Sequence, residues 1–315
     1  MSKKLQSLFS VFQSEASRLS SKGMSMLPAL VTLYTFFFIL TPLLHEIYEQ
    51  LPYQNMVLMY AGVSTLISAT CFIAANLFFF VLYIKKIPYF ENYRISDAPW
   101  PWETDPEGYK LKLRGTLRTL LLNHLIILPG ISYIGATVLK NEMNLMLEGL
   151  PSGKDLLYNI LFFMIVEDFM FYWGHRLFHT PWMYKRFHKQ HHEYKISIGL
   201  ASSYAHPVEF ILGNLLPSAL GPMMLGPNCH MFAWFVWVGI RTFETVDGHS
   251  GYDFPWSPFR LLPFSAGAAY HGYHHSHNIG NYGSFLTYLD TLFGTNRSYC
   301  IYRAKNDSLS NKLLR

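Results

Sequence analysis

The feature that most constrains this chain is a series of long runs without a formally charged side chain. Residues 23–44 form one such run of 22 residues, and residues 56–84 form another of 29. A helix needs about 20 apolar residues to cross the hydrocarbon core of a bilayer. Because backbone polar groups inside a bilayer must be satisfied internally, runs of this length predict membrane-spanning helices.

Three further apolar segments follow. Residues 119–139 predict a third span, interrupted at Pro129-Gly130, and residues 156–172 predict a fourth. Residues 210–240 are uncharged and contain two Gly-Pro pairs, at 221–222 and 226–227, which predict breaks in a helical hairpin that enters or crosses the membrane. The expected fold class is therefore all-α: a polytopic membrane protein with about four transmembrane helices, a membrane hairpin and a cytosolic, helical, histidine-rich metal-binding cap.

Composition agrees with a membrane location. Charged residues make up 14% of the chain, where soluble domains carry about 25%, and hydrophobic residues make up 50%. The formal net charge of +5 is spread along the chain without a basic, aromatic-interleaved run, so we expect no nucleic-acid partner. The expected partner of the apolar segments is the lipid bilayer.

The distribution of positive charge predicts the orientation. Lys and Arg precede the first span and are frequent in residues 85–118, whereas residues 45–55 contain none. By the positive-inside rule, the N-terminus and the 85–118 segment are cytosolic. Alternating the later spans then places all the dense histidine clusters on the same cytosolic face.

Eight of the 14 histidines fall in three short clusters. The clusters are His175 with His179; His188 with His191 and His192; and His271 with His274 and His275. Residues three or four apart share a helix face, so each cluster offers paired ring nitrogens. The doubled histidines add a ligand that points elsewhere, and the number of imidazoles suits two metal ions rather than one. Spacing alone leaves iron, zinc, copper and nickel open.

Several other polar residues are weaker candidates. Asp168 lies on the helical stripe of His175 and His179, so we expect it to orient an imidazole, to ligate, or to pair with a basic side chain. His206 and His249 are isolated histidines with polar neighbours. Each is expected to be either a metal ligand or a loop cap. The remaining isolated histidines are expected to be structural: His45, His124, His230 and His277.

The order HxxxH, HxxHH, HxxHH resembles that of the membrane fatty acid hydroxylase and sterol desaturase superfamily, over residues 162–299. Residues 166–179 (VEDFMFYWGHRLFH) resemble its first histidine box. Residues 247–256 (DGHSGYDFPW) and 270–275 (YHGYHH) resemble more narrowly the sterol C-4 methyl oxidase branch. Cholesterol 25-hydroxylase has a similar HSGY segment, so a sterol side-chain hydroxylase stays open.

The resemblance implies a site. All eight clustered histidines would be catalytic metal ligands, and His249 would join them, with Asp253 at a position where relatives have another histidine. It implies two iron ions, O2 as co-substrate, and electrons from NAD(P)H delivered by cytochrome b5 or its reductase. It also implies a multi-pass protein of the endoplasmic reticulum with its active site on the cytosolic face.

The same resemblance divides the chain. The predicted parts are an amphipathic cytosolic N-terminus (1–22), a transmembrane region (23–155) with a cytosolic loop (85–118), a hydroxylase-like catalytic domain (156–299) and a C-terminal tail (300–315).

The implied function is oxidation of a 4-methyl sterol to alcohol, aldehyde and carboxylate in sterol biosynthesis, alongside other enzymes of that pathway. Hydroxylation of another lipid (a sterol side chain or a sphingoid base) and sterol desaturation remain alternatives. A membrane metal transporter is disfavoured because residues 56–84 offer only small hydroxyls and one Asn. Trp234, Phe235 and Trp237 are expected to line the substrate's path, or else to face lipid.

Overall fold

The computed structural model describes residues 26–138 and 143–313. The predicted amphipathic segment at 1–22 lies outside these residues. The described part is helical, with three isolated β-bridges and no β-strand. Five helical stretches are long and apolar enough to cross a membrane: Leu27–Glu49, Leu58–Lys85, Pro106–Val138, Gly153–Phe178 and Pro207–Asn228. The expected all-α, multi-pass architecture is confirmed.

Several of these stretches combine α-helix with a π-helical segment. The first comprises α2 (Leu27–Tyr34), η2 (Thr35–Leu40) and α3 (Thr41–Glu49), and the second η3 (Leu58–Val63) and α4 (Ser64–Lys85). The third comprises α7 (Pro106–Leu122), η4 (Asn123–Ile127) and α8 (Leu128–Val138), and the fourth is α9 (Gly153–Phe178). The fifth comprises α11 (Pro207–Glu209), η9 (Phe210–Leu215), α12 (Leu216–Leu225) and η10 (Gly226–Asn228), and α13 (Met231–His249) returns beside it.

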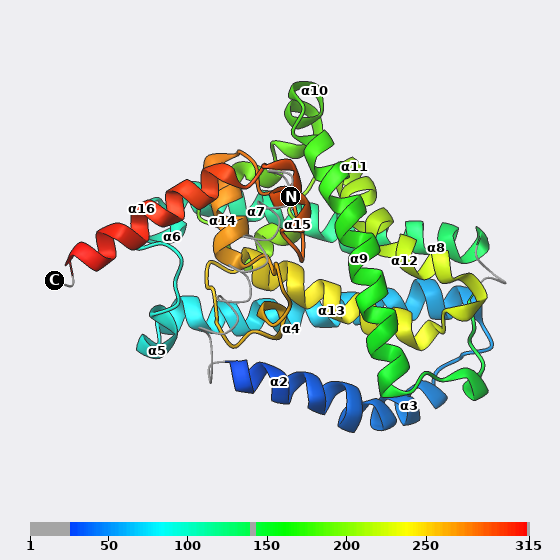
Figure 1. The fold of residues 1–315 in the computed structure, drawn as a ribbon. Helices are drawn as coiled ribbons and strands as arrows, with labels where there is room; N and C mark the ends of the chain where they lie inside the picture. The colour runs from blue at the N-terminus through cyan, green and yellow to red at the C-terminus, as the bar shows by residue number, and fades with distance from the viewer. Residues whose placement is uncertain (1–25, 139–142, 314–315) are drawn as a thin grey trace.

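Shorter helices build the remainder. These are α5 (Pro88–Glu91), α6 (Pro101–Thr104), η5 (Leu147–Gly149), α10 (Pro181–Met183), η6 (Tyr184–His188), η7 (His191–Glu193), η8 (Gly199–Ser203), η11 (Pro258–Arg260), α14 (Ala268–His277), α15 (Tyr288–Phe293) and α16 (Arg297–Leu313). In Figure 1, α4 runs alongside α13, α9 crosses α12 and α13, and α14 and α15 lie near the same end of α9.

The third span is not interrupted at Pro129, contrary to expectation. The helix continues into α8 after the π-helical segment η4, which comes just before the proline. A proline removes one N–H and crowds the carbonyl four residues earlier. A wider π turn relieves that crowding without ending the helix.

The expected break at Gly221-Pro222 is also absent, since Pro222 lies inside α12, and the hairpin turns instead at 226–230. Pro222 leaves the carbonyl of Ser218 without its usual donor. The indole N–H of Trp237 on α13 donates to this carbonyl over 2.9 Å. Gly221 lets α12 approach α9 closely, because a Cβ there would lie 2.8 Å from the Cα of Phe163.

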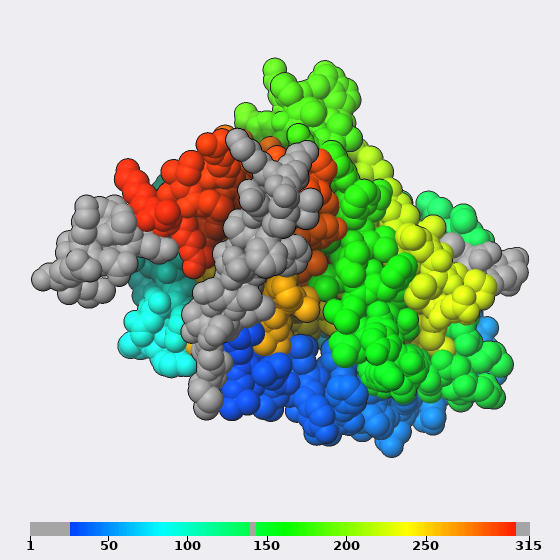
Figure 2. All heavy atoms as spheres, in the orientation of Figure 1, coloured from blue at the N-terminus to red at the C-terminus, as the bar shows by residue number. Residues whose placement is uncertain are grey.

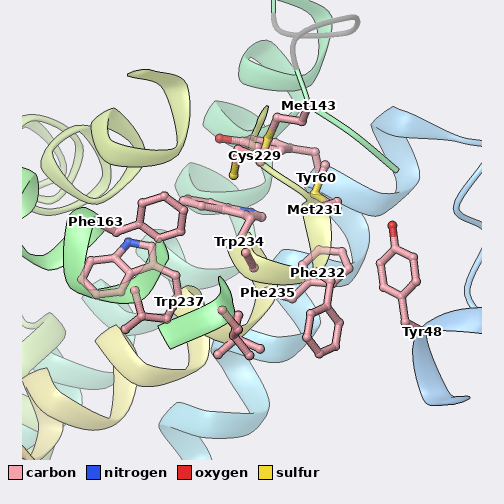
Figure 3. Packing of buried hydrophobic residues seen from close by; sticks show 14 of the residues in the cluster. Tyr48, Tyr60, Met143, Phe163, Cys229, Met231, Phe232, Trp234, Phe235 and Trp237 are labelled. Carbon is pink, nitrogen blue, oxygen red and sulfur yellow. The ribbon is translucent and has the colours of Figure 1, made fainter. Parts of the chain in front are cut away.

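The largest apolar core joins the first, second and fourth spans to α13. Tyr60 stacks on Trp234 with ring centroids 5.3 Å apart, and Trp237 lies against Phe163 (Figure 3). Aromatic rings bury large apolar areas and prefer such offset or edge contacts. This core fixes α13, the helix that ends at His249, relative to the spans.

The outer faces of the spans are apolar as well. Leu30 and Val31 on α2 are 55% exposed, and Leu66 and Ile73 on α4 are 66% and 64% exposed. Figure 2 shows α2, α3 and α9 on one outer face of the molecule. Exposed apolar side chains along helices of this length are expected to contact lipid.

A second core of aromatic side chains lies at the end of α4. It includes Tyr83, Trp100 and Tyr252, and the Tyr83 hydroxyl donates to the carbonyl of Ser250 over 2.8 Å. The 85–118 segment therefore packs directly on the loop that follows His249, and it encloses the histidine clusters from that side.

Candidate metal centre

The structure collects nine histidines into two groups. In each group one ring nitrogen per residue lies within 4.8 Å of the others. The first group is His175, His179, His188, His192 and His274, and the second is His191, His249, His271 and His275. These are all eight clustered histidines together with His249.

In the first group the Nε2 atoms form a closed ring of short contacts. His188 Nε2 lies 3.0 Å from that of His179 and 2.9 Å from that of His192. His274 Nε2 lies 3.1 Å from that of His179 and 3.2 Å from that of His192. The buried Nε2 of His175 has no hydrogen-bond partner among the described residues, and its ring centroid is 4.5 Å from that of His274.

In the second group the Nε2 atoms form a chain. His249 Nε2 lies 3.3 Å from that of His191 and 3.0 Å from that of His271, which lies 3.0 Å from that of His275. The two groups adjoin, because the rings of His192 and His275 stack with centroids 4.7 Å apart. The arrangement offers two adjoining sets of ligand atoms.

Helix geometry explains how three clusters make two groups. Residues four apart lie on one helix face, and successive residues point about 100° apart. His271 and His275 on α14 therefore enter the second group together, while His274 enters the first. Similarly, His188 and His192 enter the first group and His191 the second.

Three of the opposite ring nitrogens are held by backbone carbonyls. His175 Nδ1 lies 3.0 Å from the carbonyl of Tyr282, and His274 Nδ1 lies 2.6 Å from that of Gly280. His249 Nδ1 lies 2.7 Å from the carbonyl of Thr245, one turn earlier on α13. Because a carbonyl only accepts, each of these Nδ1 atoms carries the proton and each Nε2 presents a lone pair to its group.

A carboxyl group lies beside the corresponding ring nitrogen of His188. Its Nδ1 lies 2.8 Å from Oε1 of Glu209, which is buried. No role for Glu209 was predicted from the sequence. Glu209 stands immediately before the uncharged run that begins at Phe210. A carboxylate at the edge of a membrane segment is costly to bury without a partner, so this position was the sequence signal for a functional role.

Two acidic side chains hold the loop that carries the carbonyls of Gly280 and Tyr282. Asp290 accepts hydrogen bonds from the backbone N–H groups of Tyr282 (2.9 Å) and Gly283 (2.7 Å). Asp168 accepts from the N–H of Leu286 over 2.9 Å. Asp168 therefore lies against the loop and not against an imidazole. An ion pair with a basic side chain was the other role expected for Asp168. That pair is made instead by its neighbour Glu167, which lies 2.9 Å from Arg241.

Two other candidates lie outside both groups. Asp253 pairs with Arg260 at 2.9 Å, and the same guanidinium pairs with Asp247 at 2.8 Å. His206 caps α11, where its Nδ1 accepts from the N–H of Val208 over 3.2 Å. Capping was one of the two roles expected for His206 from the sequence.

The isolated histidines also lie outside the two groups. His230 caps α13 through the N–H of Phe232, and His277 stacks on Tyr273. His124 packs between Phe72 and Phe210, with ring centroids 4.7 and 5.8 Å away. None of these side chains contacts the two groups through a described hydrogen bond.

The grouped histidines outside the spans are held neutral. Burial, with neighbouring imidazoles adding to it, lowers the pKa of His179 to about 2. The same causes lower the pKa well below its usual value for His188, His191, His271, His274 and His275. Neutral imidazole is the form that ligates a metal ion.

These features fit a metal ion in each group. Lone pairs that face one another at about 3 Å repel unless a cation lies between them, and imidazole nitrogens bind metals at about 2.0–2.1 Å. Carbonyl and carboxylate partners on the far ring nitrogen are typical of metal-ligating histidines. The all-imidazole set suits iron, zinc, copper or nickel.

An apolar cavity of about 370 Å³ lies next to the centre, between the second and third spans, the hairpin and α13. Asn214, Ser202 and Thr245 line both this cavity and a pocket of about 30 Å³ against His175, His188, His191, His249 and His271. Trp234 and Trp237 line the large cavity, and Phe235 packs on Tyr48. All three side chains are buried, so the lipid-facing alternative is wrong.

Comparison with known proteins identifies the family. The model of the fatty acid hydroxylase family matches residues 160–295. A protein of Dictyostelium discoideum, provisionally named methylsterol monooxygenase, is 37% identical over 264 residues, which cover 82% of this chain and 95% of the relative. The chain belongs to the fatty acid hydroxylase family. The family resemblance inferred from the histidine boxes is thereby confirmed.

Other members of the fatty acid hydroxylase family match a shorter region. A very-long-chain aldehyde decarbonylase of Oryza sativa is 47% identical over 153 residues, which are 48% of this chain and 56% of the relative. Methylsterol monooxygenase 2-2 of Arabidopsis thaliana is 46% identical over the same shares. The chain thus spans about half the length of these two relatives. No solved structure matches this chain.

Proposed function

We propose that this chain is a membrane monooxygenase that oxidises a 4-methyl group of a sterol, using two iron ions held by the nine grouped histidines. The single observation that carries the proposal is the joining of two adjoining all-imidazole groups to an apolar cavity between the spans. The names of relatives that match along the chain favour a methylsterol as the substrate.

The cavity suits a lipid. Its volume of about 370 Å³ lies in the usual range of ligand sites, and its lining is apolar, with Tyr60, Trp234 and Leu128 among its walls. A sterol is rigid and almost entirely apolar, so burial of its surface would drive binding. Because the cavity lies between spans, we propose that the substrate enters from the bilayer.

The residues of the centre hold the metal site in one geometry. Carbonyls of Tyr282, Gly280 and Thr245 fix three imidazoles with Nε2 facing inward, and Glu209 lies beside a fourth. When bound, iron supplies the O2 chemistry that breaks a C–H bond, which no acid–base pair of side chains can do. The apolar walls exclude water from the carbon that reacts.

The proposed reaction takes the methyl group to alcohol, aldehyde and carboxylate in successive rounds. Each round consumes one O2, two electrons and two protons; one oxygen atom goes to the substrate carbon and the other leaves as water. In the second round the resulting gem-diol loses a further water to give the aldehyde. The electrons would come from NAD(P)H through a carrier such as cytochrome b5 or its reductase. We propose the endoplasmic reticulum membrane, with the histidine centre on the cytosolic face, where the basic residues of 85–118 also lie.

The test uses protein purified in detergent after iron-replete expression. We expect about two irons per chain, and a 4-carboxysterol from a 4,4-dimethyl sterol supplied with O2, NADPH, cytochrome b5 and its reductase. Iron with a side-chain alcohol as product would keep the centre and discard the substrate. Protein that retains no metal in either group would remove the basis of the proposal.

A second candidate function rests on one observation. The rice relative, named as an aldehyde decarbonylase, shares 47% identity over 153 residues. A decarbonylase would shorten a long-chain aldehyde by one carbon. Incubation with a C26 aldehyde, followed by hydrocarbon analysis, separates this activity from sterol oxidation.

A further inference from the structure

Two polar side chains stand where the apolar cavity meets the histidine pocket. Asn214 on η9 and Thr245 on α13 line both spaces. Among the described residues, neither side chain has a hydrogen-bond partner. Both side chains are half-buried, so a ligand that enters the cavity can reach their polar groups and bond to both.

Several other polar groups of the cavity already have a protein partner or are covered by protein atoms. The hydroxyl of Ser218 donates to the carbonyl of Asn214, that of Thr242 to Val238, and that of Ser202 to Gly199. Ser64 accepts the indole N–H of Trp234. Both ring nitrogens of His124 are covered by protein atoms.

Asn214 and Thr245 differ from the other unpaired polar side chains of the cavity because they also line the histidine pocket; the hydroxyls of Tyr60, Ser68, Ser132 and Ser203 line the cavity alone. Thr245 lies one turn before His249, whose Nδ1 its carbonyl holds, and Asn214 lies near the C-terminal end of η9. Tyr60, Ile134 and Val138 line the cavity away from the histidine pocket. Tyr60 lies beside Gly135, where an added Cβ would be 3.1 Å from its ring, so these residues belong to the same part of the cavity.

We propose that Asn214 and Thr245 bind the hydroxyl group of the lipid substrate. The substrate then lies with its polar end toward the histidines, and the carbon that reacts is close to the carbon that bears the hydroxyl. This inference rests on the proposed function, and it adds the residues that select the position of oxidation.

The chemistry of sterols makes this selection sharp. The only hydroxyl of a simple sterol is at C3, next to C4, so a hydroxyl bound at Asn214 and Thr245 brings the C4 methyl group to the centre. A side-chain carbon would arrive there only if the sterol were reversed, and the hydroxyl would then lie away from Asn214 and Thr245.

The test compares two ligands in purified protein: a 4,4-dimethyl sterol with its 3β-hydroxyl, and the same sterol without it. Binding is measured by displacement of radiolabelled 4,4-dimethyl sterol, independently of turnover. The wild-type protein is expected to bind the hydroxylated sterol about 10-fold more tightly, in line with hydrogen bonds made in a buried site. Thr245→Val and Asn214→Leu should each bring this ratio close to 1 and leave metal content unchanged.

Matched variants complete the experiment. Thr137→Val removes a hydroxyl from an exposed position of α8 that already bonds within its helix, and it should keep the 10-fold ratio. Thr245→Ser retains the hydroxyl and should restore the preference, and Asn214→Leu gives an independent reading if Thr245→Val does not fold. Folded variants that bind sterol with an unchanged ratio would overturn the inference. Wild-type protein that binds neither sterol would instead overturn the proposed function.

Discussion

The histidine centre and the apolar cavity differ in how tightly their geometry is specified. In the centre, eight of the nine imidazoles lie about 3 Å from a neighbouring ring nitrogen, and several lie against a carbonyl or a carboxylate. In the cavity, the walls are aliphatic and aromatic side chains with few directional contacts. Hydrogen-bonded networks tolerate little change, whereas apolar packing adapts to volume-conserving change.

This difference implies that the centre and the cavity have separate roles in the family. The centre would be shared by enzymes that act on different lipids, because its chemistry is the same for each. The cavity would decide which lipid reaches it. Relatives named for methylsterols and for long-chain aldehydes both match about half of this chain at 46–47% identity. Substitutions in the two regions should therefore have different signatures.

The largest effect is expected at His191, which belongs to the second group. His191→Ala removes a ligand and should reduce sterol oxidation by more than about 100-fold, beyond the effect of losing an outer-shell contact. Metal content measured by plasma mass spectrometry should fall with it. His277→Ala, at the end of α14 but outside both groups, is the control and should retain activity. Full activity in His191→Ala would exclude this residue from the mechanism.

A smaller effect is expected at Glu209. Glu209→Gln keeps the side-chain shape but removes the charge beside Nδ1 of His188, so iron affinity should fall by about 10–100-fold. Competition with a chelator measures this affinity directly. Glu148→Gln, at an exposed position, should leave it unchanged. If both variants hold iron equally well, Glu209 has no role in supporting the centre.

The cavity should respond differently. Ala219→Phe on α12 fills part of its volume, and kcat/KM for a rigid sterol should fall by about 10-fold, within the range for steric discrimination in an apolar pocket. Metal content should not change. An equal fall in bound iron would show that cavity and centre are not separable.

The smallest effect is expected at Trp237. Trp237→Phe leaves the carbonyl of Ser218, already deprived of a donor by Pro222, without a hydrogen bond. The loss of about 1 kcal/mol should lower Tm by about 2–4 °C in a thermal scan. Trp182→Phe, at an exposed position, is the matched control. An equal decrease in Tm in both variants would show that the indole–carbonyl hydrogen bond does not stabilise the fold.

Prediction from the sequence was strongest where one residue type or one repeated spacing carries the information. Long uncharged runs predicted the spans because the bilayer excludes charge along their whole length. It failed at Pro129 and Pro222, since a π-helical turn in one case and the Trp237 indole in the other compensate for the missing N–H. Neither compensation is visible in the local sequence.

The sequence by itself determined the membrane architecture, the family and the set of clustered histidines, because each depends on local composition or on spacing along a helix. The tertiary structure alone decided how the histidines divide between two groups, that Asp168 bonds to Leu286, and that Glu209 lies beside His188. It also decided that Asn214 and Thr245 meet at the end of one cavity. These contacts join residues far apart in the chain, and their distances depend on how the helices pack rather than on any local pattern.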